Sequence, residues 1–247
     1  MTAAFTAALG VVTAITRNGG RMTRMANARI AGFTYLFYIA GAFPDMVLSE
    51  RATTGQGMAA KLSNIAQHAT DLRIATILSL LSGFSALVLA VTLYAITRDQ
   101  DPDLAMLGLT CRVGEGITGV VNIPTTLGLI WLATATGPDA PDRATAQALA
   151  AFLLSRNPLV SATLFAVGST LFSWLLLRGR MIPLWLARVG VVGSALLVVG
   201  LPLQLAQFLT GLVTQLMWIP VAMFELTVAV WFLIKGVRPV RSEVPIS

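Results

Sequence analysis

The chain has 247 residues, of which 56% are hydrophobic and 11% are charged, and its formal net charge is +6. Soluble domains average roughly 45–50% apolar and about 25% charged residues, so this composition excludes a soluble globular protein. Several apolar runs reach the roughly 20 residues that a helix needs to cross a bilayer, and the short alternating segments of a transmembrane β-barrel are not seen. The sequence therefore predicts an all-α membrane protein.

The first 28 residues are predicted to form a cytoplasmic or interfacial segment. They do not form a good signal peptide, because Arg17, Arg21, Arg24 and Arg29 follow the first apolar stretch instead of preceding it. Residues 29–236 then make one transmembrane domain, and residues 237–247 make a cytoplasmic tail.

Six apolar segments are predicted to span the membrane as one bundle. They are Ile30–Leu48, Ile74–Thr97, Leu104–Ala135, Leu159–Leu177, Leu186–Gly211 and Leu216–Ile234. The third is longer than a bilayer requires, so it should tilt or kink, and Pro124 is the expected kink. Small residues of the third and fifth segments, such as Gly116 and Gly190, should allow close helix contact.

Two longer connections carry amphipathic helices on the outer side of the bundle. In the first, apolar residues at helical spacing predict a helix over residues 58–72 that continues into the second span, with a polar stripe that includes Asn64 and His68. In the second, residues 137–141 break the chain, and Thr145 is the expected cap of a helix that runs through Ser155.

The Lys and Arg residues predict the orientation. Eleven of them flank the ends on the side of the two termini and five lie on the other side, while Arg112 is inside a span. By the positive-inside rule both termini are cytoplasmic, which six spans satisfy. We expect a multi-pass protein of the bacterial cytoplasmic (inner) membrane.

Three ionisable residues inside the spans are the candidate site. Arg112 and Glu115 share one face of the third span, which Asn122 continues. Glu115 is about 16 Å from the cytoplasmic end of its span and Glu225 is about 15 Å from the corresponding end of the sixth, so the two carboxyl groups should converge. Because ionisable groups in a membrane are expensive, they indicate either a functional pocket or a buried network that fixes helix register.

Further candidates lie near the outer ends of the first two spans. Asp45 and Arg73 are placed to form an ion pair there, or to act as separate interfacial anchors. His68 is a candidate proton relay, although a histidine on a polar stripe near the lipid interface is more often simply hydrated.

The sequence offers no signal for a metal or a cofactor. It has one cysteine and one histidine, which excludes an internal disulfide, a cysteine-rich metal site and a bis-histidine haem within one chain. No nucleotide-binding motif is present. The basic residues flank apolar segments, so membrane lipids are the expected partners and nucleic acid is not.

Several short motifs resemble an uncharacterised bacterial integral-membrane family, known as domain of unknown function 4386, over about residues 28–236. They are Ala28-Arg-Ile-Ala-Gly-Phe-Thr-Tyr35, Cys111-Arg-Val-Gly-Glu115, Arg180-Met-Ile-Pro183 and Phe224-Glu-Leu, with Trp231 and Lys235-Gly236 closing the series. The resemblance implies a six-helix bundle with Arg112, Glu115 and Glu225 as its marked polar positions. It implies no biochemical role.

Three classes of function are compatible with such a site. The favoured hypothesis is an enzyme or binding protein for a lipidic, isoprenoid-like small molecule that uses Glu115, Glu225 and Arg112 in carboxylate acid–base chemistry. The alternatives are a structural or regulatory subunit, which should have a dry and fully paired network, and a proton-coupled small-molecule transporter. The sequence indicates neither the ligand nor the oligomeric state.

Overall fold

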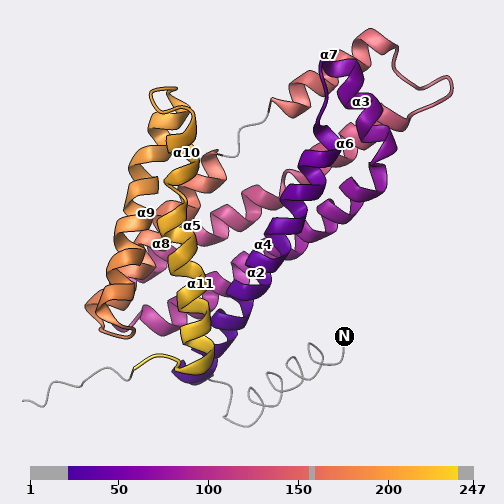
Figure 1. Ribbon diagram of the computed structural model, residues 1–247. Coiled ribbons are helices and arrows are strands. Elements are labelled where there is room, and N and C mark those ends of the chain that lie inside the picture. The colour runs from indigo at the N-terminus through magenta and orange to yellow at the C-terminus, as the bar shows by residue number, and fades with distance from the viewer. Residues whose placement is uncertain (1–21, 156–158, 239–247) are drawn as a thin grey trace, which may run out of the picture.

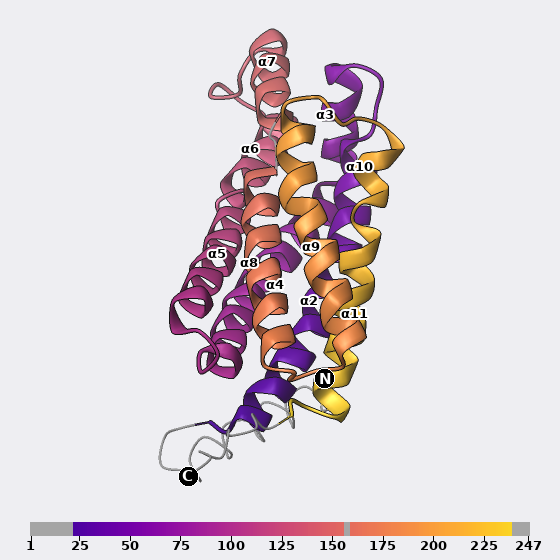
Figure 2. The same cartoon turned by 90° about the vertical axis from the view of Figure 1, so that its left-hand side faces the viewer.

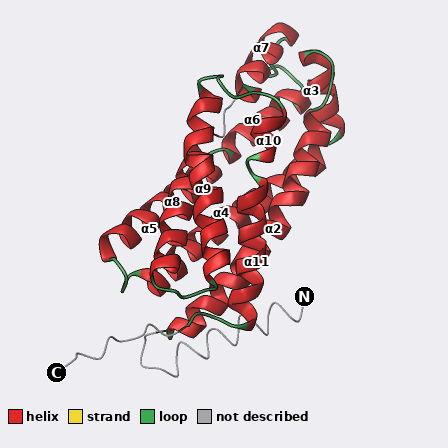
Figure 3. Cartoon of the chain, turned by 60° about the vertical axis from the view of Figure 1, so that its left-hand side comes forward, coloured by secondary structure: helices red, strands yellow, loops and turns green. Residues whose placement is uncertain are grey.

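In the computed structural model, which describes residues 22–155 and 159–238, the chain consists of helices and short connections (Figure 3). The described helices are α2 (Arg24–Thr53), α3 (Met58–Gln67), α4 (Ala69–Thr97), α5 (Pro102–Val120), α6 (Ile123–Thr134), α7 (Arg143–Leu154), α8 (Leu159–Arg178), α9 (Leu184–Leu205), α10 (Leu212–Leu216) and α11 (Ile219–Ile234). Six segments within this part of the chain are long and apolar enough to cross a membrane, and no strand occurs in it. The predicted fold class is confirmed.

Most of the predicted terminal segments lie outside the described residues. These include residues 1–21 of the N-terminal segment and residues 239–247 of the tail, and Arg156 is not described either. The first described helix begins at Arg24, where the side chain of Thr23 accepts a hydrogen bond from the backbone N–H of Ala26. Residues 24–28 therefore extend the first helix.

The third span is two helices instead of one. Helix α5 ends at Val120 and α6 begins at Ile123, with Asn122 between them. Pro124 lies in the first turn of α6, where a helix does not use the backbone N–H that proline lacks. The expected kink is therefore present as a helix break.

The last two spans have different ends from those predicted. Helix α9 stops at Leu205, and Gln207 follows it in a turn with a φ of 62°, so the predicted end at Gly211 is wrong. The turn still contains Phe208 and Leu209, so the apolar sequence continues past the end of the helix. Helix α11 begins at Ile219, after the short helix α10, with Pro220 in its first turn.

Six helices form a closed ring at one end of the molecule. Along the ring α2 packs on α4, α4 on α5, α5 on α8, α8 on α9, α9 on α11 and α11 on α2. One continuous apolar core, which includes Tyr35, Leu93, Phe172 and Phe232, fills this half of the ring. We call it the closed end; the first and last described helices begin and end there (Figure 1).

The ring separates into two arms toward the opposite end, which we call the open end. One arm combines α3, α6 and α7 with the C-terminal part of α2 and the N-terminal part of α4, around Ile65, Leu129 and Ala150. The other combines α8, α9 and α11 around Phe165 and Leu197. Figure 1 shows the two arms diverging toward α7 and α10, and Figure 2 shows the long helices running side by side. The split leaves space between the arms.

Ion pairs tie the helix ends together at the closed end. Arg24 at the start of α2 lies 2.7 Å from Asp99, and Arg178 at the end of α8 lies 3.2 Å from Asp101. The backbone N–H of Arg238 donates to the carbonyl of Met181 at 3.0 Å. These contacts join the start of α2, the end of α8 and the segment after α11 to the turns between the spans.

The amphipathic helices of the open end differ in detail from the predictions. The first of them is interrupted at His68, so that α3 and α4 are separate helices. The cap of α7 is Asp142, whose side chain accepts from the backbone N–H groups of Ala144 and Thr145, so the prediction that Thr145 is the cap is wrong. Asp142 is the cap because it lies directly before the first helical turn, where its carboxylate can accept hydrogen bonds from two free backbone N–H groups.

Candidate functional site

Arg112 and Glu115 form an ion pair inside the bundle. Their three-residue spacing places both side chains on one face of α5, and Arg112 Nη1 lies 3.0 Å from Glu115 Oε2. Arg112 is 0% exposed and Glu115 is 6% exposed. Such burial is tolerated because each charge has a partner, whereas an unpaired buried charge costs several kcal/mol, about 3–5 when a partner is removed.

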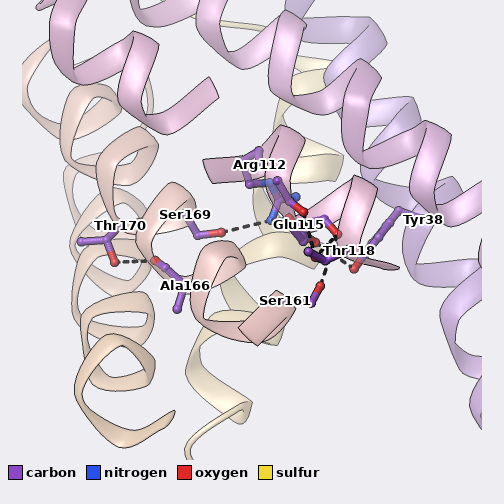
Figure 4. A network of polar contacts seen from close by, with 9 residues as sticks. Tyr38, Arg112, Glu115, Thr118, Ser161, Ala166, Ser169 and Thr170 are labelled. Atoms are coloured by element: carbon purple, nitrogen blue, oxygen red, sulfur yellow. Dashed lines mark hydrogen bonds and ion pairs between the residues drawn. The ribbon is translucent and has the colours of Figure 1, made fainter. Parts of the chain in front are cut away.

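Helix α8 completes the surroundings of Arg112. The guanidinium carbon lies 4.8 Å from the centre of the Phe165 ring, a cation–π distance, and Nη1 donates to Ser169 Oγ at 3.4 Å. The remaining nitrogens, Nε and Nη2, have no hydrogen-bond partner among the described residues. Figure 4 shows Arg112 and Ser169 pointing toward each other across the two helices.

Glu115 joins three helices. Tyr38 of α2 donates its hydroxyl to Glu115 Oε1 at 3.3 Å, and Ser161 of α8 donates to the main-chain carbonyl of Glu115 at 3.2 Å (Figure 4). The carboxylate is thus held by Arg112 on one oxygen and by Tyr38 on the other. Its position is determined by contacts, as a preorganised site requires.

Glu225 is buried without an ionic partner. It lies on α11 and is 6% exposed, yet no hydrogen bond or ion pair holds its carboxyl group within the described part of the chain, and its Oε1 is fully buried. The preceding residue, Phe224, packs against Gly190 of α9, where a Cβ atom would come within 2.6 Å of the ring. Close contact between α9 and α11 therefore holds the segment that carries Glu225.

Both carboxyl groups border one cavity between the two arms. Its volume is about 700 Å³. Its polar lining residues are Tyr38, Asp45, Ser49, Thr76, Ser79, Ser82, Glu115, Asn122, Thr126, Ser161 and Glu225. Its larger apolar lining residues are Met46, Ile123, Phe165, Trp218 and Val221. Arg112 lies behind this wall, beside Glu115 and Phe165.

Of the four further residues that the sequence suggested for the site, two line the cavity and two do not. Asn122 lines the cavity at the break between α5 and α6. Asp45 also lines it, nearer the open end, and accepts hydrogen bonds from Ser79 at 2.6 Å and from Ser49 at 3.2 Å. Two serine hydroxyls therefore contact Asp45, and the pair with Arg73, one of the two possibilities that the sequence left open, is not formed.

Arg73 and His68 are not among the residues that line the cavity. Arg73 is exposed, and the ion pairs found among the described residues do not include one between Arg73 and Asp45. His68 Nδ1 lies 3.0 Å from Asp71 Oδ2 at the junction of α3 and α4. His68 lies at the junction itself and Arg73 lies in the first turns of α4.

The described residues contain no group of three or more His, Cys, Asp and Glu side chains that could hold a metal ion. The site instead presents two carboxyl groups in unlike surroundings: Glu115 is ion-paired with a guanidinium, and Glu225 has no ion pair within the described residues. Pairs of titratable groups whose environments differ in this way are suited to act as acid and base.

Several residues of the site were not predicted from the sequence. Tyr38 and Ser161 contact Glu115, and Ser79 contacts Asp45, but each lies on a different helix from its partner. A weak signal for Tyr38 was available, because Tyr35 and Tyr38 put two hydroxyl groups on one face of an otherwise apolar span. Serine in an apolar helix carries no such signal, since its hydroxyl can bond to its own backbone.

Comparison with known proteins identifies the family. The family model described as "Domain of unknown function (DUF4386)" matches residues 30–236 of the chain. No curated protein and no solved structure matches it.

Proposed function

The chain belongs to the DUF4386 family, whose description names no activity, so we infer its function from the site. We propose that the protein binds an amphiphilic small molecule in the cavity between the arms. Glu115 and Glu225 act on the polar end of that molecule. The observation that carries the proposal is the buried, unpartnered carboxyl group of Glu225 at the wall of a cavity of about 700 Å³.

The size of the cavity supports a small-molecule ligand. Ligand pockets in proteins typically measure about 300–1,000 Å³ and combine apolar walls with a few polar groups. Here Ile123, Phe165 and Trp218 offer the apolar walls and the carboxyl groups offer the polar ones. A lipidic molecule with an isoprenoid-like chain and one polar end would match these walls, because its chain can contact the apolar residues and its polar end the carboxyl groups.

A purely structural role is less well supported by these contacts. A network that only fixes helix register should be dry and fully paired. Glu225 lacks a partner in the described part of the chain, and so do two nitrogens of Arg112. Unsatisfied buried groups beside a cavity are instead typical of a site whose ligand supplies the missing contacts.

In the enzymatic form of the proposal, Glu225 exchanges a proton with the ligand while Glu115 stays paired with Arg112. A positioned general acid or base contributes about 10²–10⁴ in rate. Tyr38 positions Glu115 through its hydroxyl.

One observation favours proton-coupled transport as a second candidate. The cavity lies toward the open end, while the other half of the bundle is filled by the apolar core and tied by the Arg24–Asp99 and Arg178–Asp101 pairs. A site near mid-bundle that is closed on one side is what one state of an alternating-access protein presents. Transport would require these contacts to open.

Filling the cavity tests the binding proposal without removing a charged group. Gly119 lines the cavity, and a Cβ atom there would meet no atom within 4 Å, so Gly119→Leu should fold and obstruct the site. Ala40→Leu, on the exposed face of α2, is the matched control. We expect farnesol, a neutral isoprenoid alcohol, to raise the melting temperature of the wild type and of Ala40→Leu in detergent, but not that of Gly119→Leu. An equal shift in all three proteins, or in none, would contradict the proposal.

A further inference from the structure

The side chains in the cavity lining that can carry a full charge near neutral pH are all carboxylic acids. They are Asp45, Glu115 and Glu225, and the described lining contains no Lys, Arg or His. The one cation beside the site, Arg112, is paired with Glu115. The walls therefore carry more negative than positive formal charge, which makes the cavity attractive to a cation and unfavourable for an anion.

The three carboxyl groups are not equally available. Glu115 is held by Arg112 and Tyr38, and Asp45 by Ser49 and Ser79. Glu225 alone among them has no hydrogen bond or ion pair within the described residues, although it is 94% buried, the complement of its 6% exposure. A group of opposite charge placed beside Glu225 would satisfy the buried carboxylate.

Aromatic side chains line the same cavity. Phe165 and Trp218, whose ring centres are 5.9 Å apart, both line the cavity. Aromatic faces attract ammonium groups as well as apolar chains. Phe165 and Trp218 could therefore contact either the ammonium group or the apolar chain of an organic cation.

We infer that the ligand of this cavity is an amphiphilic amine, whose ammonium group pairs with Glu225 while its apolar chain lies against Phe165 and Trp218. The inference rests on the proposed function and names the ligand class. In the empty cavity, burial favours the protonated form of the Glu225 carboxyl group. When the ammonium ion binds, the O–H bond of Glu225 breaks, the proton leaves to solution through the open cavity, and the ligand's positive charge takes its place.

Three ligands with one chain and different polar ends test this inference. Farnesylamine, farnesol and farnesoic acid present a cationic, a neutral and an anionic end on the same isoprenoid body. Binding to the purified protein in detergent is measured by titration calorimetry, with Gly119→Leu as the background for partition into micelles. We expect farnesylamine to bind about ten- to a hundredfold more tightly than farnesol, since a charge-assisted bond contributes about 1.5–3 kcal/mol.

The variant Glu225→Gln should lose this preference, so that the amine binds no better than the alcohol. Glu50→Gln is the matched control, because Glu50 is exposed on α2 and is not among the residues that line the cavity. If Glu225→Gln fails to fold, the wild type still gives a decisive measurement in weak buffer with a pH indicator. Farnesylamine should release protons on binding, and farnesol should release none.

The possible results separate the inference from the proposed function. Equal binding of amine and alcohol, both abolished in Gly119→Leu, would overturn the amine inference and keep the binding cavity. Tightest binding of farnesoic acid would also overturn it and would point to Arg112 as the recognition group. If none of the three ligands distinguishes the wild type from Gly119→Leu, both the inference and the proposed function fail.

Discussion

The aliphatic part of the Arg112 side chain occupies the space that a side chain at Gly168 would need. A Cβ atom at Gly168 would lie 2.8 Å from Arg112 Cγ and 3.0 Å from Cδ. Helix α8 can therefore approach α5 closely enough to enclose the guanidinium only because residue 168 is a glycine. The buried charge and the missing side chain are two parts of one packing arrangement.

This relationship predicts that Gly168→Ala destabilises the protein. Arg112 cannot move aside freely, because Glu115 and Ser169 hold its other end, so we expect a loss of about 1–3 kcal/mol in the free energy of unfolding, as for other overpacked cores. Gly119→Ala is the control: it has open space at Cβ, and alanine should favour the helix by up to about 1 kcal/mol. Thermal unfolding in detergent compares the two, and a Gly168→Ala protein as stable as the control would refute the packing argument.

Arg112→Met should be among the most destabilising single changes in the bundle. It leaves the Glu115 carboxylate buried without its partner, which costs about 3–5 kcal/mol. Adding Glu115→Gln to Arg112→Met should restore part of the stability, because the amide is neutral and can still accept from Tyr38. Losses that simply add up in the double variant would show that the two side chains are not coupled.

Asn64 should stabilise the junction between α2 and α3. Its amide group donates to the carbonyl oxygens of Arg51 at 2.6 Å, Thr54 at 3.2 Å and Ala52 at 3.3 Å, which α2 leaves free at its C-terminal end. We expect Asn64→Ala to cost about 1 kcal/mol and to speed hydrogen exchange over residues 51–57. Gln67→Ala, whose amide contacts only Ser63 within α3, should leave that exchange unchanged.

The Asp142 cap of α7 should depend on pH. Hydrogen bonds from the backbone N–H of Thr145, and then from its hydroxyl and from the N–H of Ala144, hold the pKa of the Asp142 carboxyl below its usual range. A lowered pKa means that the stabilisation is present above the unfolded value of about 3.9 and is lost as the pH falls through the folded value. Asp142→Ala should therefore speed exchange of α7 amides, corrected for intrinsic rates, at neutral pH and not in acid. Asp139→Ala, in the exposed preceding turn, should have no effect at either pH.

Reporter fusions test the orientation in the membrane. Gly179 follows α8 at the closed end, and Asp139 lies between α6 and α7 at the open end. The excess of Lys and Arg near the closed end predicts that a fusion at Gly179 is cytoplasmic and that one at Asp139 is not. Reporters found on the same side would contradict the six-span topology, whereas a reversed pair would contradict only the orientation.

The sequence by itself determined those features that depend on one helix at a time. Apolar runs of sufficient length required membrane helices, because a bilayer core leaves backbone groups no other way to be satisfied. The spacing of Arg112 and Glu115 required them to share a face, because the helical repeat fixes that relation locally. The sequence also shows directly that the span of Glu225 contains no other charged residue.

Only the tertiary structure decided the features that depend on how helices meet. The turn after Leu205 and the break at Asn122 both lie inside segments that were predicted as single spans. Asp45 pairs with Ser79 instead of Arg73, and Tyr38 reaches Glu115, because of how α2 is rotated against α4 and α5. The cavity exists because α3, α6 and α7 pack on one arm and α9 and α11 on the other. Residue spacing along one chain segment carries no information on rotation or separation between segments, which arises from the summed contacts of side chains far apart in the sequence.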